Sequence, residues 1–219
     1  MSNYGVIILG GTGQVGSTVV KALMNAPRCS EVLMVTRRTI TNEYGEKCRQ
    51  IVLDTEKPEF EAEVAELAKS CSTRPLHGAS CVGVGKGSAN WAEEDLLKLE
   101  IGVVGAFARG CRAGGVDSFS LLTALGSDSS SRIRYTRIMG RKEEAIQDIH
   151  FPQLAIFRPG IIGGNVHTPR VVDLLGRLLP FSFGTIDQED IGRAFVRHFE
   201  RENAPNLSIY YNRDMWKND

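Results

Sequence analysis

Short apolar segments alternate with longer amphipathic segments along most of the chain. The first apolar segment, YGVIIL at 4–9, is apolar almost throughout, as expected for a strand that is buried on both faces of a sheet. Similar runs predict further strands at 31–36, 49–53, 79–84, 117–125, 154–160 and 207–211.

The segments between these strands have apolar residues at helical spacing. Helices are predicted at 14–26, 59–70, 91–115 and 131–149, with two further helical pieces near 169–179 and 188–202. The longest, 91–115, ends at Gly114 and Gly115, a normal helix stop. Strand and helix in turn predict βαβ units and a doubly wound parallel sheet, a Rossmann fold with helices on both faces. With no internal repeat and no linker, we expect one α/β domain over 1–219.

Composition narrows the possible partners and the compartment. The 26 basic and 26 acidic residues cancel, so net charge gives no indication of a nucleic acid or an anionic membrane as partner. Apolar runs such as VIIL fall far short of the roughly 18 residues of a membrane span, and the N-terminus shows no basic leader, so we expect no signal peptide. Five cysteines without CxxC spacing favour reduced thiols in a cytoplasmic protein over a disulfide framework or a zinc site.

A glycine-rich sequence, ILGGTGQVG at 8–16, joins the first strand to the first helix. Its glycines at 10, 13 and 16 can make a tight turn, let the backbone approach a pyrophosphate and let the helix pack on the strand. The amides of the first helical turn would then face an anion. A plain glycine turn is the alternative, and a P-loop is disfavoured because no lysine precedes Ser17. The predicted dinucleotide contacts are Gly10, Thr12, Gly13, Gln14, Val15 and Gly16.

The end of the second strand indicates which dinucleotide binds. An NAD site usually has an acidic residue there for the ribose 2′-hydroxyl, but this strand ends VTRRT. The guanidinium groups of Arg37 and Arg38 could hold the 2′-phosphate of NADP(H), so we predict NADP(H) in preference to NAD(H). A solvated basic turn is the alternative.

Two later strand ends add candidate contacts. Asp54 ends the third predicted strand and could lie beside the adenine, although a simple turn aspartate is an equally simple interpretation. The fourth ends VGVGKG at 82–87, a second glycine-rich crossing at the edge of the sheet where ligands bind. Gly85 and Lys86 are therefore candidate cofactor contacts, with a surface lysine as the alternative for Lys86.

Several of these segments together match a known family. The segments GGTGQVG, VTRR, LLTALGSDSSSRIRY, FRPG and IDQEDIGRAFV, in this order, resemble the short-chain dehydrogenase/reductase superfamily. The chain is similar to the small atypical branch that includes the Tat-interacting-protein-like oxidoreductases and the NmrA-type NAD(P)-binding proteins. The resemblance covers nearly the whole chain.

The resemblance assigns catalytic roles. In the family a tyrosine exchanges a proton with the substrate, a lysine four residues later lowers the pKa of the tyrosine and binds the nicotinamide ribose, and a serine orients the substrate carbonyl. Tyr135 takes the tyrosine position. The serine position falls at Thr123 or Ala124, of which only Thr123 has a hydroxyl. The lysine position is Met139.

A methionine at the lysine position removes the cation that the tyrosine needs. An unperturbed tyrosine titrates at about 10, so acid/base work at neutral pH needs positive charge nearby. Lys142 lies on roughly the same helical face but about 10 Å further along the axis, and Arg141 points roughly 120° away. Lys86, on another loop, is no obvious replacement either. We therefore expect slow turnover.

The resemblance also covers the last part of the chain. FRPGIIGG resembles the family loop that closes over the nicotinamide, where Pro159, Gly160 and Ile161 would contribute backbone contacts. The segment at about 161–187 should shape a small substrate pocket.

Two functions of different classes follow. The first is an NADP(H)-dependent oxidoreductase for a small carbonyl or alcohol, with Tyr135 as acid and Thr123 as polariser. The second is a catalytically poor NADP(H)-binding protein that senses redox state or acts through a protein partner. A phosphate-binding scaffold is a third option that Arg37 and Arg38 disfavour. The sequence names no substrate and leaves monomer and homodimer open.

Overall fold

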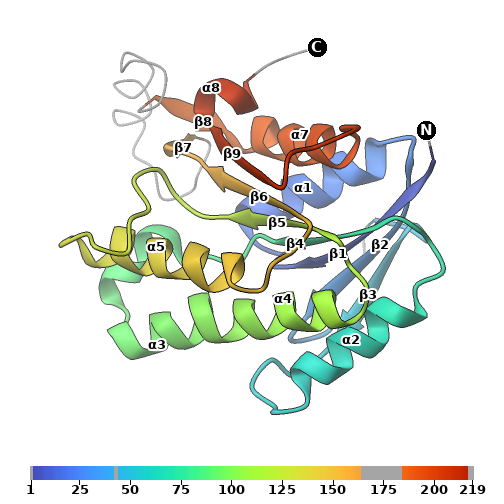
Figure 1. Cartoon of the computed structure of the whole chain (residues 1–219), viewed down its shortest axis with the longest axis horizontal. Coiled ribbons are helices and arrows are strands. Elements are labelled where there is room, and N and C mark those ends of the chain that lie inside the picture. The colour runs from blue at the N-terminus through green and yellow to red at the C-terminus, as the bar shows by residue number, and fades with distance from the viewer. Residues whose placement is uncertain (1, 42–43, 164–183, 217–219) are drawn as a thin grey trace.

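A single parallel sheet forms the centre of the molecule in the computed structural model, which describes residues 2–41, 44–163 and 184–216 (Figure 1). Its strand order is β3-β2-β1-β4-β5-β6-β9, and every neighbouring pair is parallel. The strands are β1 Tyr4–Leu9, β2 Cys29–Thr36, β3 Cys48–Val52, β4 Leu76–Ser80, β5 Ser118–Leu122, β6 Gln153–Arg158 and β9 Leu207–Tyr211. A separate pair joins β7 Ile161–Gly163 to β8 Thr185–Asp187.

Helices cover both faces of the sheet, which confirms the predicted doubly wound α/β class. Helices α1 (Gln14–Asn25) and α7 (Gln188–Phe199) pack together on one face. On the opposite face lie α2 (Phe60–Ser70), α4 (Val104–Ala113) and α5 (Arg134–Gln147), as Figure 1 shows. The shorter helices are 3₁₀ η1 (Gly85–Asn90), α3 (Glu93–Leu97), π-helical η2 (Lys98–Val103) and α8 (Asn212–Met215).

The core consists of two apolar layers, one on each face of the sheet. Val6 and Ile8 of β1 point into the layer beneath α1 and α7, where Phe195 also packs. Ile7 and Leu9 point into the layer beneath α2 and α4. Because successive side chains of a strand face opposite sides, a strand covered on both faces must be apolar throughout, which explains the sequence YGVIIL.

The order of the strands creates the crevice in which this fold binds ligands. The chain runs from β1 outward to β2 and β3, then crosses back to β4 on the other side of β1. In open α/β sheets ligands bind beyond the carboxyl ends of the strands at such a reversal. The glycine loop after β1 and the VGVG segment after β4 meet at this point.

Most predicted element bounds differ from the observed ones by one to three residues, and the largest differences are at two elements. The fourth strand lies at Leu76–Ser80 rather than 79–84, because Gly78 belongs inside the strand: a Cβ there would lie 2.6 Å from the Phe119 ring. The predicted helix 91–115 is divided into α3, η2 and α4, with a π-helical stretch between two α-helical ones. The helical piece near 169–179, and most of the segment at 161–187, lie outside the described residues.

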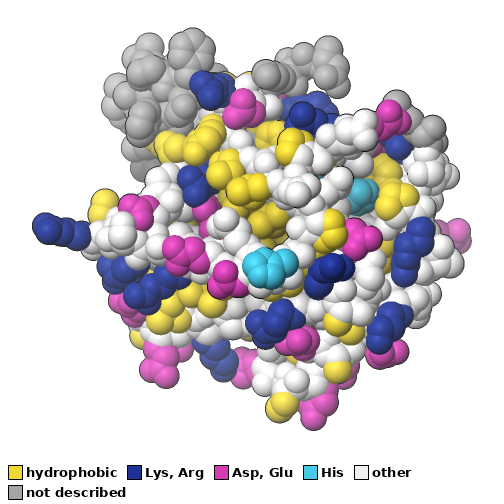
Figure 2. Space-filling model, in the orientation of Figure 1, with side chains coloured by type: hydrophobic (Ala, Val, Ile, Leu, Met, Phe, Trp, Pro, Cys, Tyr) yellow, Lys and Arg dark blue, Asp and Glu magenta, His cyan; other side chains and the backbone are white. Residues whose placement is uncertain are grey.

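The visible surface carries charges of both signs. Figure 2 shows basic and acidic side chains interspersed on the face of Figure 1. Within the described part of the chain, no helix has the length and apolar character that crossing a membrane requires.

Candidate functional site

The glycine loop has the tight geometry that its sequence predicts. Gly10 has φ of +84°, and a Cβ there would lie 2.7 Å from the amide nitrogen of Val82. A Cβ on Gly16 would lie 2.0 Å from the carbonyl oxygen of Gly10. Neither position accepts a side chain, since the left-handed turn and the close helix–strand approach both require glycine. The amide of Gly13 donates to the carbonyl of Gly10 at 3.0 Å and closes the turn.

The first turn of α1 presents free amides at this loop. The helix begins at Gln14, and the residue before it, Gly13, has no side chain with which to cap those amides. An uncapped helix N-terminus attracts anions through its amides and its dipole. Thr12 and Gln14 are exposed, whereas the Val15 side chain is buried in the core, so Val15 can reach a ligand only through its backbone.

A cavity of about 200 Å³ adjoins the loop. Its floor is the carboxyl ends of β1, β2 and β4, represented by Gly10, Thr36 and Cys81. Thr55 closes it from the turn after β3, and Leu99 from η2. These features together fit a dinucleotide: the glycine loop has no room for Cβ atoms, the helix amides are uncapped, and the cavity is partly apolar.

The Arg37–Arg38 turn is held in place by Gln50 of β3. The Gln50 side-chain amide donates to the Thr36 hydroxyl at 2.7 Å and to the Arg38 carbonyl at 2.9 Å. The guanidinium of Arg37 lines the cavity, and Arg38 is exposed beside it. Neither arginine forms an ion pair with any residue that the structure describes, so both are available to an anion.

The loop after β3 places a different residue at the cavity from the one that the sequence suggested. Asp54 is exposed, and its carboxylate accepts a hydrogen bond from the Glu56 amide at 3.0 Å, as in a turn. Its neighbour Thr55 lines the cavity. Sequence reasoning missed Thr55, Leu99 and Val103, which have no motif of their own.

Tyr135 lies in the first turn of α5, against an apolar cluster. Met139 and Ile138 belong to this cluster together with Leu96, and Tyr135 packs against it. Burial raises the pKa of Tyr135 to about 12, with a smaller contribution from the negative charge of Glu100. Its environment thus strengthens the hold on the phenolic proton, the opposite of what an acid/base tyrosine needs.

Lys142 does not replace the missing lysine, because its ammonium group is fully engaged elsewhere. It is buried and donates to the carbonyls of Val82 at 2.8 Å and Leu122 at 3.2 Å. Its third donor bonds the carboxylate of Glu100 at 2.8 Å, an ion pair in which both side chains are buried. Lys142 therefore ties the loop after β4 and the end of β5 to η2 and has no N–H left for a ribose.

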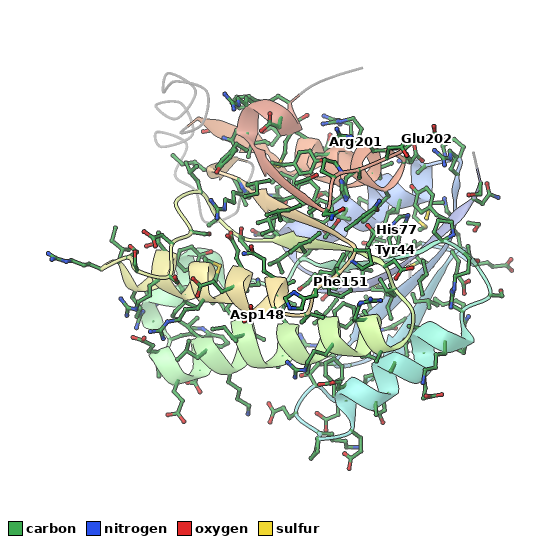
Figure 3. All side chains as sticks on the ribbon, in the orientation of Figure 1. Tyr44, His77, Asp148, Phe151, Arg201 and Glu202 are labelled. Atoms are coloured by element: carbon green, nitrogen blue, oxygen red, sulfur yellow. The ribbon has the colours of Figure 1, made fainter. Side chains whose placement is uncertain are left out.

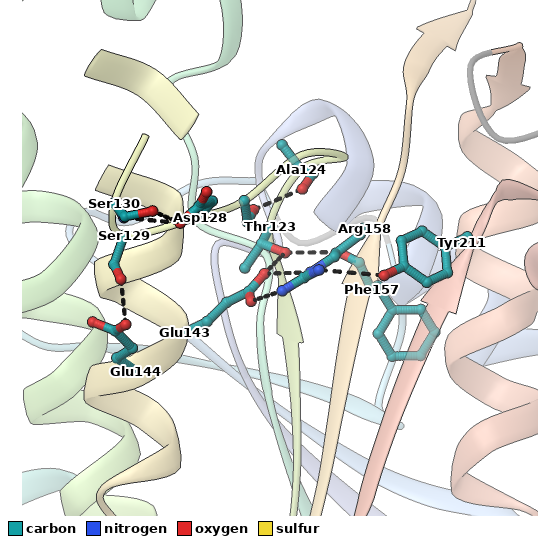
Figure 4. Close-up of polar contacts among 11 residues, drawn as sticks. Thr123, Ala124, Asp128, Ser129, Ser130, Glu143, Glu144, Phe157, Arg158 and Tyr211 are labelled. Carbon is teal, nitrogen blue, oxygen red and sulfur yellow. Dashed lines mark hydrogen bonds and ion pairs between the residues drawn. The ribbon is translucent and has the colours of Figure 1, made fainter. Parts of the chain in front are cut away.

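Thr123 lies at the end of β5 within a second polar network (Figure 4). Its hydroxyl donates to Glu143 at 2.7 Å, and the one other acceptor within reach among the described residues is the Phe157 carbonyl at 3.3 Å. Arg158 pairs with Glu143 through both Nε and Nη2, and its Nη1 donates to the Tyr211 hydroxyl at 3.3 Å. Because Thr123 has one proton and a carboxylate accepts it, the hydroxyl has none to donate to a substrate carbonyl in this arrangement.

The remaining candidate residues are dispersed. Gly160 of the FRPG turn donates its amide to the Asn212 side chain at 2.8 Å, Pro159 is buried and Ile161 begins β7. Gly85 and Lys86 fall in η1, where the Lys86 side chain lies outside the described residues. Across the described ranges, no cluster of His, Cys, Asp and Glu side chains could hold a metal ion.

Comparison with known proteins identifies the family. Residues 6–117 match the sequence model of the NAD dependent epimerase/dehydratase family. The chain belongs to this family. Its cofactor class is therefore a nicotinamide dinucleotide, and its relationship to the atypical short-chain dehydrogenase/reductases is confirmed.

Similar curated proteins include HTATIP2 and FMP52 proteins. Protein HTATIP2 of Rattus norvegicus is 29% identical over 164 residues, which cover 74% of this chain and 64% of the rat protein. Protein FMP52-1, mitochondrial, of Scheffersomyces stipitis is 29% identical over 163 residues, covering 74% of this chain and 69% of the yeast protein. The chain thus spans slightly less than two thirds of the rat relative.

Solved structures share the fold at low sequence identity. The oxidoreductase ylbE from Lactococcus lactis has a TM-score of 0.67 at 13% identity, covering 94% of this chain and 88% of that one. The Bordetella bronchiseptica enzyme WbmH, in complex with NAD+, has a TM-score of 0.68 at 14% identity, covering 94% and 74%.

Proposed function

We propose that this chain binds NADP(H) in the cleft of Gly10–Gly16 and that any oxidoreductase turnover through Tyr135 is slow. The observation that carries this proposal is the contrast between the two halves of the site. The glycine loop and the Arg37–Arg38 turn are free for a ligand, whereas Tyr135 has a raised pKa and no cation at position 139.

The binding half has a residue type suited to each part of the ligand. The first-turn amides of α1 would hold the pyrophosphate, and Arg37 with Arg38 would hold the 2′-phosphate. Thr55, Leu99 and Val103 would enclose the adenine. We propose a preference for NADP(H) over NAD(H) because the end of β2 offers two guanidinium groups and no carboxylate.

The catalytic half is poorly suited to moving protons. When bound, the nicotinamide ring donates or accepts hydride, so the protein must supply or remove the accompanying proton. With its pKa raised to about 12, Tyr135 keeps its proton at neutral pH and is a poor base. The Thr123 proton is directed at Glu143, and Lys142 is held by Glu100. We therefore propose that binding, with a redox-sensing or partner-binding output, is the main activity.

A second candidate is a slow oxidoreductase acting on a small carbonyl or alcohol. Its support is that Tyr135 and the hydroxyl of Thr123 are both retained and follow the same strand, β5. For this activity the Thr123 hydroxyl would have to turn from Glu143 to the substrate.

The domain organisation, the location and the partners are also part of the proposal. We propose one domain with a substrate-side segment at about 161–187; the seven-stranded sheet supports the one-domain organisation. We keep a cytoplasmic location as a proposal; the fungal relatives are named as mitochondrial proteins. A homodimer and a protein partner are both compatible with the function proposed.

Calorimetric titration of the full chain with NADPH and with NADH, followed by a carbonyl substrate screen on the same sample, tests this function. The proposal expects NADPH to bind more tightly and to be consumed slowly. Equal affinities would remove the NADP(H) preference, and rapid consumption that Tyr135→Phe abolishes would make the chain an efficient enzyme.

A further inference from the structure

A second cavity lies next to the dinucleotide cavity. It measures about 460 Å³ and shares Arg37, Thr55, Leu99 and Val103 with the first cavity, so the two are adjacent. Its outer wall is formed by η1, α3 and η2 on one side and by the turn after β3 on the other. Arg37, the predicted ligand of the 2′-phosphate, therefore faces both cavities.

Four charged side chains line this second cavity. Arg37 and Lys98 are basic, and Glu56 and Asp95 are acidic, so the cavity is neutral although the glycine loop beside it suits an anion. A phosphate monoester carries about −1.5 to −2 charges at neutral pH. The two carboxylates would repel it, and the two cations would attract it.

One cation and one carboxylate of this set are already paired across the cavity. Lys98, the first residue of η2, lies 3.4 Å from the carboxylate of Glu56 in the turn after β3. Both side chains are exposed, at 63% and 67%. Exposed ion pairs contribute little to stability, so Lys98 can exchange this partner for another anion at little cost.

We propose that Lys98 is a second cation for the 2′-phosphate of NADP(H), and that Glu56 is the carboxylate which holds Lys98 until the phosphate replaces it. This inference rests on the proposed function. It adds a specificity residue from η2, on the other side of the cavity from β2. The π-helical turn starts at Lys98 and brings Leu99 and Val103 to the same cavity, as π-helical turns often do at functional sites.

The two partners of this ion pair should affect binding in opposite directions. Lys98→Met removes a phosphate ligand, so NADPH should bind roughly fivefold more weakly, while NADH, which lacks the 2′-phosphate, should be unaffected. Glu56→Gln removes a competing anion and frees Lys98, so NADPH should bind roughly threefold more tightly. If the ion pair only held the turn after β3 against η2, either change would break it. Both changes would then weaken the binding of NADPH and NADH alike.

A matched control lies on α2. Lys69 and Glu66 form an exposed ion pair at 2.8 Å, and neither residue lines a cofactor cavity. Lys69→Met and Glu66→Gln make the same chemical changes and should leave both affinities unchanged. A thermal unfolding curve for each variant shows that it is folded.

The test is a titration of the full chain and these variants with NADPH, NADH and adenosine 2′,5′-bisphosphate at low ionic strength, where exposed charges act most strongly. The proposal expects Lys98→Met to weaken and Glu56→Gln to tighten the binding of both NADPH and the bisphosphate. It expects neither change to alter the affinity for NADH. If wild type prefers NADPH but Lys98→Met and Glu56→Gln change the NADPH affinity in the same direction or not at all, this inference fails and the proposed function stands. If wild type binds no dinucleotide, both fail.

Discussion

The buried carboxylate of Glu100 accepts a hydrogen bond from the ammonium of Lys142 at 2.8 Å, so the two charges form a buried pair close to Tyr135. The positive charge that α5 still carries on this face is neutralised by its own partner. The carboxylate adds to the effect of burial in raising the pKa of Tyr135. Lys142 lies on the same helix as Tyr135, but it joins the segment after β4, the end of β5 and η2 rather than acidifying the tyrosine.

The first prediction concerns this ion pair and stability. Lys142→Met should destabilise the fold by about 3–5 kcal/mol, because it leaves the Glu100 carboxylate buried without its cation. Adding Glu100→Gln should recover part of that loss, since no buried charge then remains. Urea unfolding of the two single variants and the double variant measures the coupling. Strictly additive losses would show that the two residues do not act as a pair.

The second prediction concerns the arginine turn. Arg37→Ala combined with Arg38→Ala should erase the preference for NADPH while leaving NADH affinity nearly unchanged, because only the 2′-phosphate loses its partners. Arg49→Ala, which removes an exposed arginine that pairs with Glu31, is the control. A double variant that still prefers NADPH would place the 2′-phosphate elsewhere.

The third prediction concerns position 139. Met139→Lys should raise turnover on carbonyl substrates and move its pH profile to lower pH, because a cation one turn from Tyr135 favours the phenolate. The same change should cost about 1–3 kcal/mol of stability, because the Met139 side chain is buried among apolar groups. Steady-state rates against pH give the first effect and urea unfolding the second. Adding Tyr135→Phe should remove the gain; a gain that survives would have another origin.

The sequence predicts the local motifs of the site but not the contacts between distant residues. The glycine loop and the arginine turn are local patterns, in which spacing alone places each group at the end of a strand. The Glu143–Arg158 and Lys142–Glu100 pairs join residues that are 15 and 42 positions apart, so they exist only once β4, β5 and β6 are side by side. The hydrophobic pattern of the sequence does not predict such pairs. The start of β4 was missed for a similar reason, since Gly78 is explained only by the Phe119 ring that covers it.

The fourth prediction concerns two buried histidines. Burial lowers the pKa of His77 and of His198 to about 4; the charges of His198 and Arg28 act in the same direction on His77, and that of Arg201 on His198. His77, labelled in Figure 3, stacks on Phe199, and neither of its ring nitrogens has a hydrogen-bond partner among the described residues. An unfolded histidine titrates at about 6.5. The folded state therefore binds fewer protons than the unfolded state between these values.

Stability should consequently be complete above about pH 6.5 and fall as the pH drops through 4, by up to about 3 kcal/mol for each histidine. His77→Phe keeps an aromatic ring in the core and should remove the His77 part of this decline. The control is His150→Asn, which changes an exposed histidine whose φ of 56° an asparagine accepts. Urea unfolding at a series of pH values gives the slope of the unfolding free energy against pH. Identical slopes for wild type and His77→Phe would contradict a contribution from His77.

The most direct test of slow turnover is the ionisation of Tyr135 itself. The difference in ultraviolet absorbance between wild type and Tyr135→Phe, followed as pH rises with and without NADPH, reports the Tyr135 phenolate. A pKa of about 12 predicts no phenolate from Tyr135 up to pH 10. A phenolate that forms at pH 8 or below would show that the site activates its tyrosine, and would contradict the account.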